Sequence, residues 1–152
     1  MTAQPEQRTR LSSQARWSLV IVLFNAICAI AGAVMMWTAP DTMGFGSLLP
    51  LMQQHLPLIG KLFTSFALPG ALLLVIIGLP HLWAAVLIAR DNFRAPLFVI
   101  IVGILLTGWT LLQLLIVFGP NMLSFAFLII GLLETNMGTM WANRLARQAA
   151  KN

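Results

Sequence analysis

Charged residues are scarce in this 152-residue sequence, at 9% of positions, whereas about a quarter of the residues in an average soluble domain are charged. Hydrophobic residues make up 59%. So few charges exclude an ordinary soluble helical fold, in which polar side chains cover the outer face of each helix. The net charge of +5 is small and falls in short stretches beside apolar segments. We therefore expect contact with anionic lipid headgroups and no nucleic-acid partner.

Cysteine and tyrosine are also nearly absent, with one cysteine, Cys28, and no tyrosine. A single cysteine cannot form an internal disulfide, and we interpret it as a small packing residue. Without tyrosine, and with Trp109 isolated, no aromatic cage for a cationic ligand is expected. The sequence also lacks a metal-ligand cluster, a phosphate loop and a Ser-His-acid motif. We therefore predict no cofactor, no metal and no enzymatic activity.

Four long apolar segments account for most of the chain. They run over about 17–37, 66–89, 95–118 and 122–141. About 20 helical residues cross the roughly 30 Å hydrocarbon core of a bilayer. The first segment is too long for a signal peptide and is kept as a membrane helix. The sequence therefore predicts an all-α, four-helix transmembrane bundle that forms a single membrane domain over residues 1–152.

Polar and helix-breaking residues separate these segments. Residues 90–94 and 119–121 read as tight turns. In the longer connection, 38–65, apolar residues recur at three- and four-residue spacing, which predicts an amphipathic loop on the outer membrane surface. Pro80 falls inside the second segment and predicts a bend, because proline removes one backbone hydrogen bond.

The distribution of basic residues predicts the orientation. Eight of the nine lysines and arginines fall in the N-terminal tail, in the 90–94 turn or in the C-terminal tail, and Lys61 alone falls on the opposite side. Cytoplasmic loops carry the excess of basic residues. We therefore predict that both termini are cytoplasmic and that the loop 38–65 faces outward.

Glu134 and His81 are the acidic and basic side chains within the apolar segments, and Asn25 is a third strongly polar group. Each lies nine or ten residues from the nearest arginine, so all three are expected at one depth, about 14–15 Å from the cytoplasmic charges. Ionisable groups in a membrane are costly and mark candidate functional sites. Thr107, Thr110 and Gln113 are secondary candidates in the third segment.

Small residues share helix faces with these polar groups. Small residues mark the faces on which membrane helices approach one another closely, so these faces are predicted to point inward. The four stripes are Ser18, Asn25, Ala29 and Gly32; Gly78, His81, Ala85 and Ala89; Gly103, Thr107 and Thr110; and Gly131, Glu134, Gly138 and Trp141.

Several functions are compatible with this cluster. It can fix the register of the helices, bind a proton or cation at Glu134 beside His81, or contact another subunit. The first hypothesis is a small non-enzymatic accessory, assembly or structural subunit that contacts a larger membrane protein or itself. The alternative is a homo-oligomeric, proton-coupled small-molecule transporter or channel that uses Glu134. A third, an intramembrane enzyme acting on lipid or isoprenoid, lacks a catalytic motif.

Several short motifs carry a resemblance to a known group. They are Ala39-Pro40-Asp41, Gly46 to Leu51, Phe66 to Gly70, Leu82 to Leu87, and Gly103 to Leu106 followed by Trp109 and Gln113. Together they resemble a widespread group of small bacterial four-helix membrane proteins, over about two thirds of the chain. The resemblance implies a bacterial plasma-membrane location and implies no activity. The His81 and Glu134 pair departs from the pattern of that group.

Overall fold

The computed structural model describes residues 12–41, 50, 53–54, 65–117 and 122–151, and its main elements are all helices. The elements are α1 (Ser13–Thr38), α3 (Ala67–Leu73), the π-helical turn η2 (Leu74–Gly78), α4 (Leu79–Ala89), α5 (Ala95–Val117) and α6 (Met122–Ala149). Since α3, η2 and α4 follow without a break, they form one span, Ala67–Ala89. Four helices are thus long and apolar enough to cross a membrane, which confirms the predicted all-α, four-span architecture.

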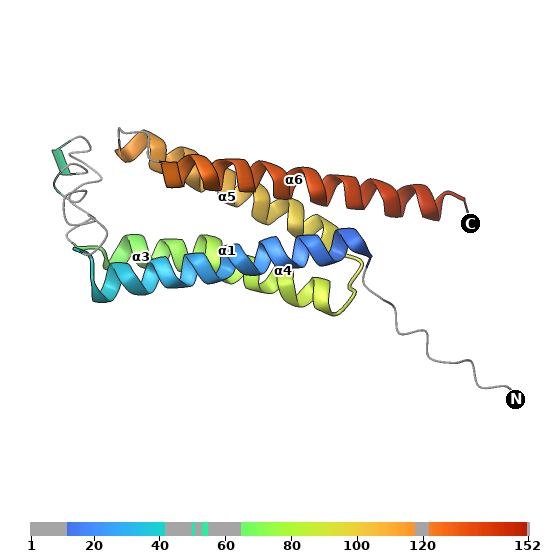
Figure 1. Ribbon diagram of the computed structural model, residues 1–152, viewed down its shortest axis with the longest axis horizontal. Coiled ribbons are helices and arrows are strands. Elements are labelled where there is room, and N and C mark those ends of the chain that lie inside the picture. Colours follow the sequence, from blue (N-terminus) through green and yellow to red (C-terminus); the bar gives the residue numbers. More distant parts are fainter. Residues whose placement is uncertain (1–11, 42–49, 51–52, 55–64, 118–121, 152) are drawn as a thin grey trace, which may run out of the picture.

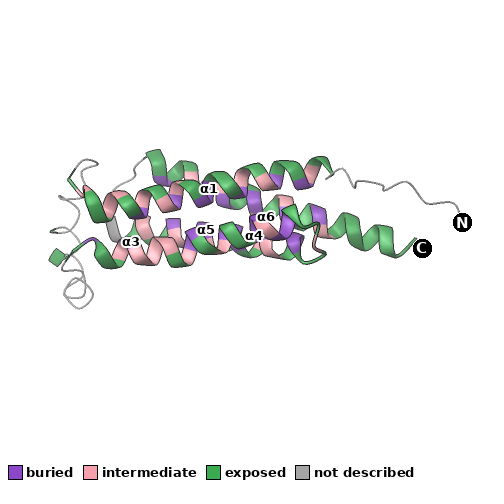
Figure 2. Ribbon diagram, turned by 90° about the horizontal axis from the view of Figure 1, so that it is seen from below, coloured by how far each residue is buried: buried purple, intermediate pink, exposed green. Residues whose placement is uncertain are grey.

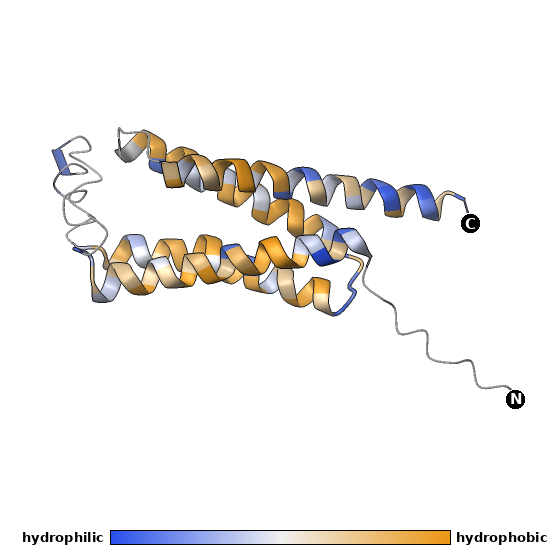
Figure 3. Ribbon diagram, in the orientation of Figure 1, coloured by the Kyte–Doolittle hydropathy of each residue, from blue (hydrophilic) through white to orange (hydrophobic). Residues whose placement is uncertain are grey.

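Polar residues gather at the ends of these helices, and apolar residues cover their middles (Figure 3). The start of α1, the turn between α4 and α5, and the end of α6 lie at the same end of the bundle (Figure 1). We call this the terminal end, and the opposite end, where α1 finishes and α3 and α6 begin, the loop end. The described part of the predicted 38–65 loop is limited to 38–41, 50, 53–54 and 65, so its amphipathic character lies outside the described residues.

Two helices are longer than the sequence predicted. α1 begins at Ser13 because the hydroxyl of Ser12 accepts a hydrogen bond from the Ala15 N–H at 3.2 Å, which satisfies one of the free donors at a helix start. α6 continues through the basic tail to Ala149. Arg147 lies in its last turn, where a positive charge is favoured by the helix dipole.

The second span is irregular, as Pro80 predicted, but the irregular turn lies just before Pro80. The missing N–H of Pro80 leaves a carbonyl without its usual partner in the turn before it. That turn, η2, is wound as a π-helix, and the N–H of Leu79 donates to the carbonyl of Leu74. Single π-turns of this kind often lie at functional sites. Here the turn directly precedes His81.

The four spans form two pairs. α1 lies along α3, η2 and α4, and α5 lies along α6 (Figure 1). The α5–α6 contact is close because glycines face backbone: a Cβ on Gly103 would lie 2.6 Å from the Thr135 nitrogen, and one on Gly131 would lie 3.0 Å from the Gly103 carbonyl oxygen. Such approaches are typical of small-residue interfaces in membranes.

The turn between α4 and α5 is closed by backbone hydrogen bonds. The N–H of Asn92 donates to the Leu87 carbonyl and the N–H of Asp91 to the Ile88 carbonyl, each at 3.0 Å. These are the two bonds of a Schellman motif, whose central residue adopts a left-handed conformation. Asp91 occupies that place with φ 50°. The motif ends α4 and turns the chain into α5 at the terminal end.

Buried residues form two apolar clusters, one in each half of the bundle. Figure 2 shows the buried residues interspersed with exposed ones along the helices. The cluster in the terminal half consists of Ala15, Val22, Ala84, Ala85, Leu87, Ile88, Ala95, Val99, Val102 and Trp141. The cluster in the loop half has Ala29, Ile77 and Leu106 as its buried members. The residues of the predicted inward stripes are buried or half-buried, with the exception of Ala89. Ala89 is exposed because it is the last residue of α4 and lies beyond the packed region.

Candidate functional site

Glu134 forms hydrogen bonds with side chains of two other helices. The amide nitrogen of Asn25 on α1 donates to Oε1 at 3.0 Å, and Nε2 of His81 on α4 lies 3.2 Å from Oε2. The three side chains are 0–1% exposed. We call them the polar cluster. The structure thus brings together the three primary candidates that the sequence placed at one depth, and their action as a site stays a prediction.

The hydrogen bonds of His81 determine where its protons lie. Nδ1 is 2.7 Å from the carbonyl oxygen of Ile77. A carbonyl only accepts, so Nδ1 carries a proton and donates it. One further proton then lies between Nε2 and Oε2. Either Glu134 is a neutral acid that donates to a neutral imidazole, or a carboxylate accepts from an imidazolium, and the pair has zero net charge in both forms.

Asn25 suits both forms of the pair. Its amide nitrogen donates to Oε1, which is an acceptor whether the proton lies on Oε2 or on Nε2. The proton can therefore cross between Glu134 and His81 without a rearrangement of Asn25. A buried neutral pair of this kind also avoids most of the cost of placing a charge in a membrane.

The polar cluster joins the two helix pairs. Glu134 belongs to the α5–α6 pair, whereas Asn25 and His81 belong to the pair formed by α1 and the second span. On α6 the carboxyl stands between Gly131 and Gly138, whose missing side chains let α5 and α6 come together. The cluster lies between the two apolar clusters along the bundle axis.

The three secondary candidates do not join the polar cluster. The hydroxyls of Thr107 and Thr110 donate to carbonyls of their own helix, those of Gly103 and Leu106, at 2.8 and 2.7 Å. Thr107 is half-buried against α6, where a Cβ on Gly131 would lie 2.6 Å from its Oγ1. Thr110 and Gln113 instead line a cavity.

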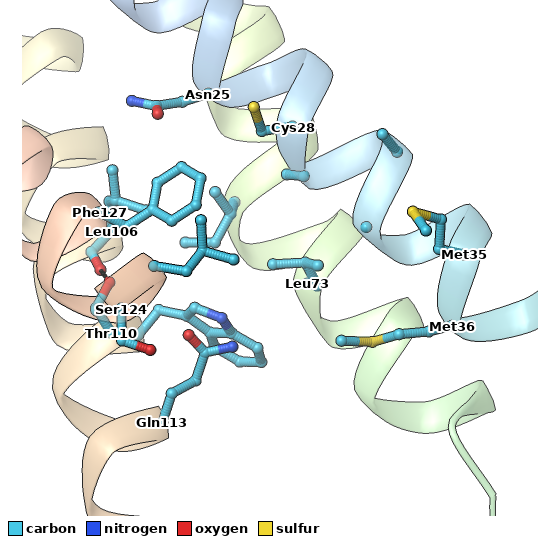
Figure 4. Close-up of a pocket in the computed structure, with 16 residues that line it drawn as sticks. Asn25, Cys28, Met35, Met36, Leu73, Leu106, Thr110, Gln113, Ser124 and Phe127 are labelled. Atoms are coloured by element: carbon cyan, nitrogen blue, oxygen red, sulfur yellow. Dashed lines mark hydrogen bonds between the residues drawn. The ribbon is translucent and has the colours of Figure 1, made fainter. Parts of the chain in front are cut away.

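This cavity of about 350 Å³ lies between the two helix pairs in the loop half of the bundle. Figure 4 shows Cys28, Met36 and Leu73 of α1 and α3 on one side, and Thr110 and Phe127 of α5 and α6 on the other. Asn25 and Gln113 stand at opposite ends of the labelled residues. Because α1 and α5 both run from the terminal end to the loop end, Asn25, near the middle of α1, marks the end nearest the middle of the bundle, and Gln113, near the end of α5, lies toward the loop end.

The cavity walls are apolar with a few polar groups. Among the lining residues that the structure describes, none is acidic, basic or a histidine. Two buried polar atoms on lining residues, Oδ1 of Asn25 and Nε1 of Trp109, have no hydrogen-bond partner among the described residues. The amide of Gln113, on a half-buried side chain, forms no hydrogen bond with a described residue either. The walls are therefore suited to a neutral ligand with little polar surface.

Sequence reasoning missed this cavity. It interpreted Cys28 as a packing residue, whereas the half-buried Cys28 lines the cavity. Phe127 is also a lining residue that no motif singled out, and Trp109, which lines the cavity as well, was noted only as an isolated tryptophan and as part of the resemblance. The run of small residues Ala29, Ala31 and Gly32 was visible in the sequence, and all three line the cavity. Small residues signal close helix contact or empty space, and only the positions of neighbouring helices decide between the two.

Comparisons with known proteins leave the family open. No protein-family model, curated protein or solved structure matches this chain. Within the described part of the chain, no three His, Cys, Asp or Glu side chains are grouped as a metal site would require. The resemblance to small bacterial membrane proteins is thus supported in its architecture alone: this is a multi-pass membrane protein with four candidate spans.

Proposed function

We propose that this chain is a non-enzymatic, proton-coupled carrier of small molecules. The observation that supports the proposal most is the position of one shareable proton, between His81 and Glu134, in a cluster whose third member lines a cavity. Asn25 contacts both the carboxyl and the cavity. The cavity lies within a single chain, so this role does not require a second copy to complete the binding space.

Proton gain or loss would change the charge of a buried pair. Removal of the shared proton leaves a carboxylate facing the lone pair of Nε2, and addition of one leaves an uncompensated imidazolium. Either charge costs several kcal/mol in a membrane interior unless the surroundings rearrange. Because Glu134 joins the two helix pairs, such a rearrangement would act on the space between them. This is the physical basis for coupling the proton to the contents of the cavity.

The proposed location is a bacterial plasma membrane, with both termini in the cytoplasm. The basic residues support this orientation, since all six that the structure describes lie toward the terminal end, near the start of α1, in the α4–α5 turn and at the end of α6. In this orientation the cavity is in the outer half of the membrane. The packed apolar cluster around Ile88 and Val99 then lies between the polar cluster and the cytoplasm. Ser18, a buried hydroxyl without a described partner, is the next polar group on the α1 face toward that side.

The second candidate is a structural or accessory subunit. It is favoured by the fact that both side-chain hydrogen bonds to Glu134 cross between the helix pairs. In this role the cluster fixes the register of the helices and its proton never leaves. Interhelical polar bonds in membrane proteins contribute about 0.6 kcal/mol on average, which is sufficient to select one register among similar packings.

Infrared difference spectroscopy on the protein in lipid nanodiscs tests the proposal. The carboxylic acid of Glu134 has a carbonyl stretch distinct from that of a carboxylate. We expect this band to change when the pH is varied, because a carrier has to release and take up the shared proton. The matched variant is Glu134→Gln. Its amide oxygen accepts from Asn25 and its amide nitrogen donates to His81, so it reproduces the bonds of the neutral form.

The two candidates predict different spectra. A carrier shows the carboxyl band in the wild type and loses it in Glu134→Gln, while the variant keeps its helical circular dichroism and unfolding midpoint. A band that stays constant over the whole pH range in the wild type would reject the carrier and leave the structural role.

A further inference from the structure

The cavity between the two helix pairs has the properties of a binding site. Its volume, about 350 Å³, lies within the range of small-molecule sites and is little more than twice that of an engineered cavity of about 150 Å³ that takes up benzene. We propose that it binds a neutral, mostly apolar molecule of about 10–15 non-hydrogen atoms that carries one hydrogen-bonding group, with Gln113 as the partner of that group.

The absence of charge on the walls selects a neutral ligand. No charged side chain is among the described lining residues, and the polar cluster beside the cavity has zero net charge. An ion in the cavity would lose its hydration without gaining a counter-charge, which is costly. Apolar side chains such as Leu73, Leu106 and Phe127 supply most of the walls and favour an aromatic or aliphatic body.

Gln113 supplies the polar contact. Its side chain is half-buried, its amide makes no hydrogen bond to a described residue, and it stands at the loop end of the cavity (Figure 4). A glutamine amide can donate to or accept from a ligand hydroxyl. A lipid acyl chain could fill the same volume, but it would leave this amide without a partner. A hydroxyl on an apolar body matches both features.

This inference gives the ligand class of the proposed carrier. The coupling of the ligand to protons rests on the proposed function, whereas binding itself does not. Binding is therefore measured at one pH without a proton gradient. If Glu134 titrates while the cavity stays empty, this inference alone fails. If the cavity binds while Glu134 does not titrate, the carrier alone fails.

The natural cysteine provides the assay. Cys28 is the single cysteine of the chain and lines the cavity, so one N-ethylmaleimide adduct, counted by intact mass spectrometry, reports on the occupancy of the cavity. The full-length protein in nanodiscs is labelled with and without 2-naphthol, naphthalene or 2-naphthalenesulfonate. We expect both neutral probes to slow labelling in a saturable way, and the sulfonate to leave it unchanged.

Two variants make the assay specific. Gln113→Leu removes the amide and keeps the approximate size of the side chain, and it should weaken protection by 2-naphthol about five-fold without affecting naphthalene. The control is Cys28→Ser combined with Ala89→Cys. Ala89 is the exposed last residue of α4 at the terminal end, away from the cavity, so a cysteine there reports on general effects of the probes on labelling. None of the probes should protect the control cysteine.

Three results would overturn the proposal. Equal labelling of Cys28 with and without saturating neutral probe means that the cavity does not bind them. Equal protection of the control cysteine means that the probes slow labelling without binding in the cavity. Protection by 2-naphthol that is unchanged in Gln113→Leu removes the assigned polar contact. A tightly bound lipid found by native mass spectrometry, with Cys28 reactive only after delipidation, would assign the cavity to an acyl chain instead.

Discussion

The two halves of the bundle are built from similar helices but are packed differently. In the terminal half, Ala84, Ile88 and Val99 are fully buried where the helix pairs meet. In the loop half, the same two pairs leave a partly open cavity of about 350 Å³ between them. The difference teaches that close packing in this protein comes from particular small and branched side chains, and that the polar cluster lies where that packing stops.

This arrangement gives the cluster one open direction. Toward the terminal end, the apolar cluster around Ile88 lies between Glu134 and the basic residues. Toward the loop end, Asn25 lines the cavity. Membrane helices gain no hydrophobic driving force from contact with one another, so a hollow between them costs lost van der Waals contacts. A ligand in the cavity would restore those contacts.

A glycine substitution in the terminal half should show the largest effect. A Cβ on Gly138 would lie 2.8 Å from the Ile100 nitrogen and 3.0 Å from the Pro96 carbonyl oxygen, so Gly138→Leu has to push α5 and α6 apart. We expect a loss of about 3 kcal/mol in the free energy of unfolding. The measurement is reversible unfolding by SDS in mixed micelles, followed by circular dichroism.

Gly108→Leu is the control on the exposed side of α5. A Cβ on Gly108 meets nothing within 4 Å, and leucine is the better helix former, so this variant should be unchanged or up to about 1 kcal/mol more stable. Equal losses for the two variants would show that the close approach of α5 and α6 at Gly138 does not determine stability.

Truncation of large side chains gives the second comparison. Ile88 is fully buried, and Ile88→Ala should cost about 2–3 kcal/mol because it opens a new cavity in a closely packed region. Leu73 already lines a cavity, so Leu73→Ala should cost less than about 1 kcal/mol. The same SDS titration measures both. A larger loss at Leu73 would mean that the loop half is the better packed one.

Much of this architecture is predictable from the sequence. Hydropathy alone located the four spans, because about 20 apolar residues have few alternatives to a membrane helix. The inward faces were also predictable, because glycines share a stripe with each polar group. Gly131 and Gly138 do contact α5, and Glu134 between them is buried. The common depth of Asn25, His81 and Glu134 followed from counting residues to the nearest arginine.

Other features depend on tertiary packing and could not be predicted. Ala29 and Gly32 do pack against the second span, as their stripe predicted, since a Cβ on Gly32 would lie 3.1 Å from Leu73. Both also line a cavity, because the α5–α6 pair stands away from them, and this had no signal in the sequence. Pro80 indicated that the second span is irregular, but the π-turn absorbs that irregularity at Leu74–Gly78. The partner of His81 Nδ1, the Ile77 carbonyl, belongs to that turn and had no sequence signal.

Glu134→Ala should show an intermediate effect at the boundary between the halves. It leaves the amide of Asn25 and the ring of His81 without their hydrogen-bond partner, and we expect a loss of about 2 kcal/mol. Glu134→Gln, which keeps both hydrogen bonds, should stay within about 1 kcal/mol of the wild type. Equal stability of the alanine and glutamine variants in the SDS titration would show that the cluster does not hold the helix pairs together.

Asp91→Gly should show the smallest effect, and it extends the comparison to the turn that joins α4 and α5 at the terminal end. Asp91 holds a left-handed backbone conformation with φ 50°, which costs a residue with a Cβ about 1 kcal/mol and costs glycine almost nothing. We expect Asp91→Gly to raise the unfolding free energy by about 0.5–1 kcal/mol, and Asp91→Ala to lower it slightly, because alanine tolerates this conformation less well than aspartate.

A stabilised turn should leave labelling of Cys28 unchanged, since the cavity lies in the other half of the bundle. A change in the labelling rate would show instead that the two halves move together, so that packing at the terminal end controls access to the cavity.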